Sequence, residues 1–268
     1  MFTKILFLAL FFQAPTLPPL HPPIEPDTIF IPLNEDIPKE VTQTQEQSMV
    51  IIQATMPILS EDHRLHVQPR FTEGFVVWPG YVLTTLHLAG GYPALWGGNS
   101  NFPTAFTIAD GKALFEASLV DYNYKADLAL LQVHSPNGWA VEFSKKPLKI
   151  VESIAPPSGD ASLITPLPAK LFAFAYYSTD PHLFFAASIG PLRAITNSFD
   201  GGRITDIPFA LVQGTIQPGF SGGPLLAPDG TAVGMVQGII GIYTTVILPE
   251  TMHTFLSSAR VKLGLDKN

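Results

Sequence analysis

The segment Gly219-Phe220-Ser221-Gly222-Gly223-Pro224 constrains the fold more than any other stretch of this chain. It places a serine in a glycine-rich turn between two short apolar runs, so the backbone must bend sharply there. A serine in such a turn is exposed, and neighbouring N–H groups can point at an incoming carbonyl oxygen. The same residues also make an ordinary turn between strands. A catalytic turn requires that the chain also supplies a base and an acid.

A candidate base follows a predicted β-hairpin. Apolar and aromatic runs flank Pro79-Gly80, and this pattern is typical of two strands joined by a tight turn. His87 comes directly after the second run and precedes a predicted loop at Ala89-Gly90-Gly91. An imidazole titrates near neutral pH, so it can take up and return a proton. A solvated histidine at a loop is the alternative interpretation.

A candidate acid precedes another apolar run. Asp127 stands directly before residues 128–133, which predict a buried strand. A buried carboxylate is costly unless a charged or hydrogen-bonding group meets it. An imidazole N–H is such a partner. An aspartate that caps a turn at the strand edge is the structural alternative.

With these residues in the order His, Asp, Ser, the chain resembles the trypsin/chymotrypsin-fold serine peptidases. The resemblance is greatest to the bacterial HtrA (Deg)-like branch, and it spans about residues 45 to 265. It rests on the stretches 73–77, 81–87, 126–131, 216–226 and 230–236. The chain ends soon after the last of these, so no peptide-binding PDZ domain is expected after it.

The resemblance implies a role for each of these residues. Ser221 would be the nucleophile, His87 the general base and then the general acid, and Asp127 the group that orients the imidazole. The N–H groups of Gly219 and Ser221 would form the oxyanion hole. The implied activity is that of a serine endopeptidase acting through an acyl-enzyme intermediate, with no cofactor and no metal.

Two residues depart from the family pattern. Phe220 occupies the position of an aspartate in pancreatic-type enzymes and of an asparagine in HtrA-like enzymes. Leu86 replaces the small alanine that usually precedes the histidine. Either change could tilt the loop that carries the serine. The alternative function is therefore a latent or inactive protease-fold module that binds peptides.

The resemblance also implies the walls of a substrate site. Thr215 falls where trypsin-like enzymes carry the acid that selects lysine or arginine, so a basic residue before the scissile bond (P1) is disfavoured. Isoleucines nearby favour a shallow pocket for a small or medium apolar P1 side chain. The residues assigned to substrate binding are Thr215, Ile216, Gln217, Gln237, Gly238 and Ile239.

The expected fold is all-β, with two six-stranded antiparallel β-barrels, a C-terminal helix and a proline-rich N-terminal extension. The first barrel is assigned to residues 45–150, and the second barrel with the helix to residues 151–268. Met252, Phe255, Leu256 and Ala259 recur at helical spacing after Pro249, and Gly264 can end that helix.

The N-terminus carries a separate signal. Lys4 precedes a short apolar run, which predicts a signal peptide or short membrane anchor over residues 1–14. Residues 15–44 are rich in proline and predict an extended linker. We therefore expect an exported protein (periplasmic, cell-envelope or secreted) with a possible membrane tether.

Composition limits the classes of partner. The formal net charge is -7 and no cluster of lysine and arginine occurs, which argues against nucleic-acid binding. The chain has no cysteine, so disulfides and thiolate metal sites are excluded. A polypeptide substrate is the expected partner, and the oligomeric state is left open.

Overall fold

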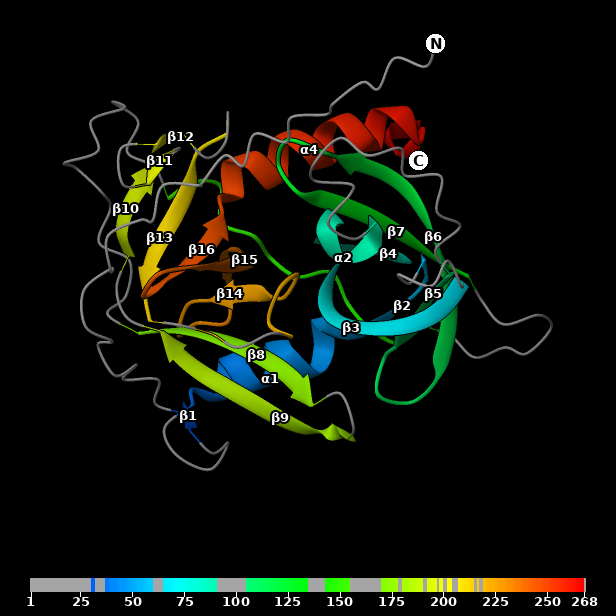
Figure 1. Cartoon of the computed structure of the whole chain (residues 1–268), viewed down its shortest axis with the longest axis horizontal. Coiled ribbons are helices and arrows are strands. Elements are labelled where there is room, and N and C mark those ends of the chain that lie inside the picture. The colour runs from blue at the N-terminus through cyan, green and yellow to red at the C-terminus, as the bar shows by residue number, and fades with distance from the viewer. Residues whose placement is uncertain are drawn as a thin grey trace, which may run out of the picture.

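Two β-structures lie side by side in the computed structural model of this chain (Figure 1). The residues that it describes are 30–31, 37–59, 65–90, 105–134, 143–154, 170–177, 180–189, 192–196, 198–199, 202–203, 207–214, 216 and 219–267. The predicted signal segment (1–14) lies outside them, as does most of the predicted linker (15–44).

The first β-structure is a closed six-stranded antiparallel barrel with strand order β2-β3-β4-β7-β6-β5. Alternating apolar residues fill its interior, where Val50, Ile52, Val82 and Leu131 are at most 1% exposed. The expected hairpin joins β3 to β4, and Gly80 turns there with φ 76°. The strands are β2 Met49–Leu59, β3 Leu65–Trp78, β4 Tyr81–Thr85, β5 Ala105–Ala109, β6 Leu114–Asn123 and β7 Leu128–His134.

The second β-structure is an eight-stranded antiparallel sheet, with order β1-β9-β8-β14-β15-β16-β13-β10. Its strands are β1 Phe30–Ile31, β8 Leu171–Tyr177, β9 Asp180–Ile189, β10 Leu192–Thr196, β13 Phe209–Gln213, β14 Pro224–Leu226, β15 Ala232–Ile240 and β16 Tyr243–Ile247. A separate two-stranded ribbon pairs β11 Ser198–Phe199 with β12 Gly202–Arg203.

The all-β class of the chain is confirmed, because a closed six-stranded barrel packs beside a second sheet that is followed by a helix. The second sheet differs from the expectation of six strands. One reason is that the N-terminal segment β1 adds to the edge of β9, where Phe30 pairs with Ala187.

A shared apolar core joins the two β-structures. Phe75, Leu83 and Leu130 from the first barrel meet Phe172 and Met235 from the second sheet. Each of these side chains is at most 3% exposed. Burial of an apolar side chain of this size contributes about 1.5–3 kcal/mol. The two halves are therefore held together by core packing as well as by the chain connection. Residues of a site between them are supported by this packed core.

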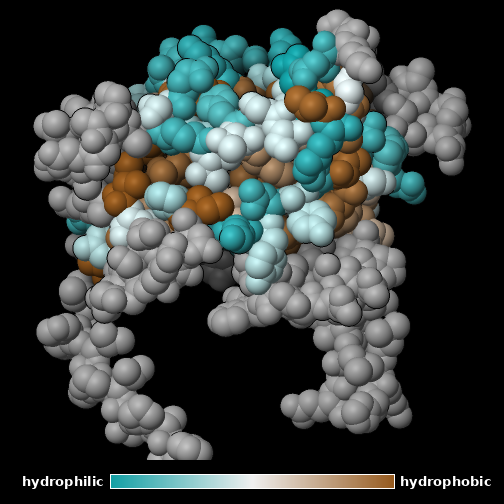
Figure 2. Space-filling model, turned by 90° about the horizontal axis from the view of Figure 1, so that it is seen from above, coloured by the Kyte–Doolittle hydropathy of each residue, from teal (hydrophilic) through white to brown (hydrophobic). Residues whose placement is uncertain are grey.

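The C-terminal helix α4 (Pro249–Lys262) is confirmed, and it crosses both halves (Figure 1). Met252, Phe255, Leu256 and Ala259 face the core, as their spacing predicts. The helix ends at Lys262, and Gly264 then turns the chain with φ 69° before the short 3₁₀ turn η1 (Leu265–Lys267). Figure 2 views the molecule from this side, and its apolar residues lie in small groups among polar ones. No helix in the described part of the chain is long and apolar enough to cross a membrane.

Helix α1 (Lys39–Ser48) begins inside the segment predicted to be an extended linker. Val41 is fully buried in the shared core, and the Thr44 hydroxyl donates a hydrogen bond to the Gly230 carbonyl at 3.1 Å. The predicted boundary between linker and first barrel, at residue 44, therefore falls inside α1. Residues 39–44 are helical and pack against the second sheet. The proline content of residues 15–44 predicted an extended linker. The contacts that α1 makes with distant residues have no counterpart in the local sequence, so the helix was not predicted.

A chain that begins at residue 45 is expected to be less stable than one that begins at residue 37. The shorter chain lacks buried Val41 and the Thr44 hydrogen bond. Together they contribute about 2–4 kcal/mol. At roughly 2–4 °C per kcal/mol, the melting temperature should fall by about 5–15 °C in calorimetry. Equal melting temperatures for the two chains would show that α1 contributes nothing to the fold.

Candidate active site

Two strands of the first barrel bring His87 and Asp127 together. Strands β4 and β7 are antiparallel partners, and Thr85 at the end of β4 pairs with Leu128 at the start of β7. The residues just beyond this pair therefore emerge at the same end of the barrel. His87 lies in the short helix α2 (Leu86–Gly90), where the sequence had predicted a strand end followed by a loop.

The Asp127 carboxylate holds His87 at two points. Its Oδ2 lies 2.7 Å from His87 Nδ1, and its Oδ1 accepts the backbone N–H of His87 at 2.8 Å. A carboxylate can only accept here, so the Nδ1 atom carries the proton and the Nε2 atom is left as a base. Asp127 is 2% exposed and His87 18% exposed, so the acid is shielded while the imidazole stays accessible.

The backbone at Asp127 supports this arrangement. Asp127 has φ 57°, and no other non-glycine residue in the described part of the chain has a positive φ. Aspartate and asparagine adopt this left-handed conformation more readily than most residues. The Asp127 carbonyl also accepts the N–H of Leu86 at 3.0 Å, so the turn before β7 is tied to the start of α2.

Leu86 fits into the first barrel without displacing the histidine. Its side chain is 4% exposed and packs in the barrel core with Val82 and Ala129. The large residue that departs from the family pattern therefore has an apolar site of its own.

The serine turn extends from the second sheet toward the first barrel. The Gly222 N–H donates to the Val236 carbonyl at 2.9 Å, and the Val236 N–H donates to the Gly223 carbonyl at 2.9 Å. These bonds attach the turn to β15. Gly219 and Gly222 adopt φ 112° and 85°, conformations that favour glycine and that the sequence motif predicted.

Phe220 fills the core beneath the turn. Its ring is 1% exposed and packs with Ile216, Val233 and Val236 in the second sheet. The Phe220 carbonyl accepts the Gly223 N–H at 3.1 Å. Because a trans peptide directs its C=O and N–H in opposite directions, the Ser221 N–H points away from this bond. The phenyl ring therefore anchors the turn in a position where the family uses a polar side chain.

The N–H groups of Gly219 and Ser221 donate no hydrogen bond among those formed within the described residues. Both belong to the turn that carries the serine. Two backbone donors left open in this way are what an oxyanion hole requires.

Gln237 links the serine to the His–Asp pair. The Ser221 hydroxyl donates to the Gln237 carbonyl at 3.0 Å, and the Gln237 Nε2 atom lies 3.4 Å from Asp127 Oδ2. Within the described residues, no hydrogen bond joins Ser221 to His87. The Ser221 hydroxyl is therefore held by the backbone of β15.

A β-bulge explains how one residue makes both contacts. In the pairing of β15 with β16, Val236 opposes Val246 and Gly238 opposes Thr245, so Gln237 is the extra residue. A bulge locally interrupts the ladder and turns a side chain toward a new direction. The sequence indicated Gln237 only as a wall of the substrate site, since bulges leave no reliable signal in a single sequence.

The other residues predicted to bind substrate differ in exposure. Ile239 is 43% exposed on β15 next to Gly238, whereas Ile216 is 4% exposed and packs in the core beside Phe220. Thr215 and Gln217 lie outside the described residues.

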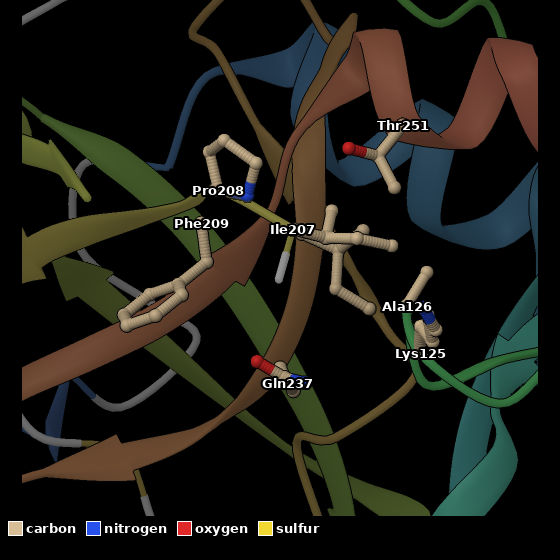
Figure 3. A pocket seen from close by; sticks show the side chains of 8 residues that line it. Lys125, Ala126, Ile207, Pro208, Phe209, Gln237 and Thr251 are labelled. Carbon is tan, nitrogen blue, oxygen red and sulfur yellow. The ribbon is translucent and has the colours of Figure 1, made fainter. Parts of the chain in front are cut away.

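A small pocket lies beside Gln237 (Figure 3). Ala126, Ile207 and Thr251 are among the residues that line it. Its cavity volume is about 20 Å³. A single water needs about 10–15 Å³, and a substrate pocket needs several hundred. The pocket can therefore hold a water but cannot hold a substrate side chain.

No three acidic or histidine side chains in the described ranges are grouped so that they could hold a metal ion. The groups that the structure does bring together at this site are the Ser221 hydroxyl, the His87 imidazole and the Asp127 carboxylate, with Gln237 between them.

Comparisons with known proteins identify the family and the fold. A family model described as trypsin-like peptidase domain matches residues 72–235, which is more than half of the chain. A search of curated proteins matched none. Among solved structures, the active form of the Rv3671c protease from M. tuberculosis is 21% identical with a TM-score of 0.55, and the alignment covers 81% of this chain and 82% of that chain.

The inactive form of the same protease is 20% identical, also with a TM-score of 0.55, and the alignment covers 82% of this chain and 92% of that chain. Because active and inactive forms match equally well, the similarity concerns the fold and not the state of the site.

Proposed function

The chain belongs to the family of trypsin-like peptidase domains and is a hydrolase of the serine peptidase class, and from this premise we propose that it is an endopeptidase with Ser221 as nucleophile. The observation that carries the proposal is the continuous set of contacts from Ser221 through Gln237 and Asp127 to His87. A nucleophile, a base and an orienting acid in one connected site are the parts that acyl transfer needs.

In the proposed reaction, the Ser221 hydroxyl leaves the Gln237 carbonyl and turns to His87 Nε2. The imidazole takes the proton as Oγ attacks the peptide carbonyl, and Asp127 stabilises the imidazolium that forms. The open N–H groups of Gly219 and Ser221 bind the oxyanion. The imidazolium then protonates the leaving amine, and a water hydrolyses the acyl-enzyme by the same proton transfers in reverse.

The proposed substrate binds along β15. Residues Ala232 and Met235 pair with β14, but beyond Met235 the strand pairs only with β16 among the described strands. Gln237, Gly238 and Ile239 therefore present one edge to an added peptide strand, which would bind through main-chain hydrogen bonds.

For the P1 residue we infer a small or medium aliphatic side chain. The sequence has no carboxylate at residues 215–217 to bind a basic P1 group, and Ile239 is exposed at the edge of β15. Cleavage of a peptide library should show this preference, and a majority of cleavages after lysine or arginine would contradict it.

We expect Ser221 to react with a fluorophosphonate, which forms a covalent bond only with an activated serine. The wild-type protein should be labelled in a gel assay, and Ser221→Ala should lose all labelling because the reacting oxygen is absent. Ser153→Ala is a matched control, since Ser153 lies on the connection between the two halves and bonds to Glu250 of α4. It should label like the wild type.

The alternative function is a peptide-binding module without turnover. One observation favours it, namely that the resting Ser221 hydroxyl bonds to Gln237 and not to His87. Wild-type protein that stays unlabelled, with and without added peptide, while still binding peptides would establish this alternative.

For the location, we propose export with residues 1–14 acting as a signal peptide or anchor. The basis is the charge followed by an apolar run at the N-terminus. Fractionation of cells that express the full chain should place it outside the cytoplasm or in the membrane fraction. Recovery in the cytoplasm alone would contradict this proposal.

A further inference from the structure

The carbonyl of Ser221 is held from the opposite half of the molecule. It accepts hydrogen bonds from the Thr72 hydroxyl and from the Glu73 N–H, the latter at 3.3 Å. Both donors belong to β3 of the first barrel, whereas Ser221 belongs to the turn that leads into β14 of the second sheet. Thr72 is 3% exposed, so water does not compete freely for its hydroxyl.

The same peptide is fixed at its other end. The Gly222 N–H donates to the Val236 carbonyl of β15 at 2.9 Å. The peptide unit between Ser221 and Gly222 is planar, so bonds at both its oxygen and its nitrogen determine its orientation. This single peptide therefore spans the boundary between the first barrel and the second sheet.

Strand β3 is also tied to the strand that leads to the base. The Thr84 hydroxyl donates to the Glu73 carbonyl at 2.7 Å. Thr84 is near the end of β4, and His87 follows it by three residues in α2. The register of β3 with β4 begins at Phe75 and Leu83, which leaves the backbone of Thr72 and Glu73 open toward the serine turn. One edge of the barrel thus contacts the nucleophile's carbonyl and positions the histidine.

We propose that Thr72 is a positioning residue for the nucleophile. Its hydroxyl holds the Ser221 peptide at a fixed place relative to His87 and Asp127, without touching the substrate. This inference rests on the proposed function of Ser221. Without the hydroxyl, the carbonyl keeps only the Glu73 N–H, whose 3.3 Å distance is longer than the common 2.9–3.0 Å.

Loss of this bond should lower the rate of the chemical step more than substrate binding. A displacement of about 1 Å at a reacting group can cost up to roughly a hundredfold in rate. Because one donor remains, we expect Thr72→Val to lower kcat about tenfold. KM should change less than about twofold, since Thr72 belongs to β3 and its hydroxyl bonds to the Ser221 carbonyl, whereas the substrate is proposed to bind along β15.

Two variants separate the hydroxyl from the packing of the side chain. Valine keeps the shape of threonine and loses the hydroxyl, whereas serine keeps the hydroxyl and loses the methyl group. We expect Thr72→Ser to stay within about threefold of wild type in kcat and in the rate of fluorophosphonate labelling, and Thr72→Val to lose about tenfold in both. A side chain that only packs would give the opposite order.

The measurements are steady-state cleavage of a peptide selected from the library, labelling rate and thermal unfolding of the same preparations of the full chain. If the valine variant does not fold, Thr72→Ala and Thr72→Ser replace it as a pair that differs only by the hydroxyl. Equal kcat for the two members of either pair would overturn the role of Thr72 while Ser221 stays active. Wild-type protein that neither cleaves nor labels would instead overturn the proposed function, and this inference with it.

Discussion

Asp127→Asn should lower kcat about 10⁴-fold while the protein stays folded. The reason lies in the two contacts of Asp127 with His87. The backbone N–H of His87 needs an acceptor, so the amide oxygen of asparagine will take the Oδ1 position 2.8 Å away. The amide NH₂ group then faces Nδ1, where the carboxylate oxygen was. The imidazole must accept at Nδ1 and carry its proton on Nε2, so it can no longer take the proton of Ser221.

Asparagine suits this test because it is compatible with the backbone conformation at residue 127. Asp127 has φ 57°, a conformation that asparagine also adopts readily. Asp121→Asn is the matched control, since Asp121 is on the neighbouring strand β6 and pairs with Lys262 at the surface. Steady-state kinetics should give wild-type kcat for Asp121→Asn. A kcat for Asp127→Asn within tenfold of wild type would mean that Asp127 does not set the tautomer of His87.

Gly222→Ala should destabilise the protein by about 3 kcal/mol or more and abolish labelling of Ser221. Gly222 has φ 85°, which costs an alanine about 1–2 kcal/mol. In addition, a Cβ atom there would lie 2.2 Å from the Glu73 carbonyl oxygen and 2.4 Å from the Thr84 hydroxyl. The added methyl group would enter the contact between β3 and the serine turn, so the turn must move away from the first barrel.

Gly80→Ala separates the two causes. Gly80 also has a positive φ, 76°, but no atom lies within 4 Å of the position of its Cβ. It should lose only the conformational part, a shift of a few degrees in melting temperature, and label normally. Thermal unfolding and labelling of both variants check this. Equal losses of stability would show that the approach of β3 to the serine turn is not tight.

The effect of Phe220 on the serine turn could not be predicted from its departure from the family pattern. The motif identifies the position as polar in related enzymes, and a phenyl ring there suggests a disturbed turn. In the structure the ring is 1% exposed beneath the turn, and the Phe220 carbonyl bonds to the Gly223 N–H. Whether an aromatic residue distorts or supports a turn depends on an apolar space that residues distant in the sequence create.

The sequence by itself determined the features that depend on neighbouring residues. Apolar alternation and turn residues predicted the β-hairpin at Gly80, the positive φ of the glycine turn, and the amphipathic helix α4. Local motifs also identified His87, Asp127 and Ser221 as candidate site residues. The predictions of the hairpin, the glycine turn and the helix succeeded because conformational preference and periodicity act over a few residues.

Only the tertiary structure decided how those residues meet. The pairing of Thr85 with Leu128 joins His87 to Asp127, and contacts across 110 and 149 residues of sequence bring in Gln237 and Thr72. The packing of α1 on the second sheet belongs to the same class. Hydrogen bonds and core packing between distant segments depend on which strands become neighbours, and no local pattern in a single sequence specifies that choice.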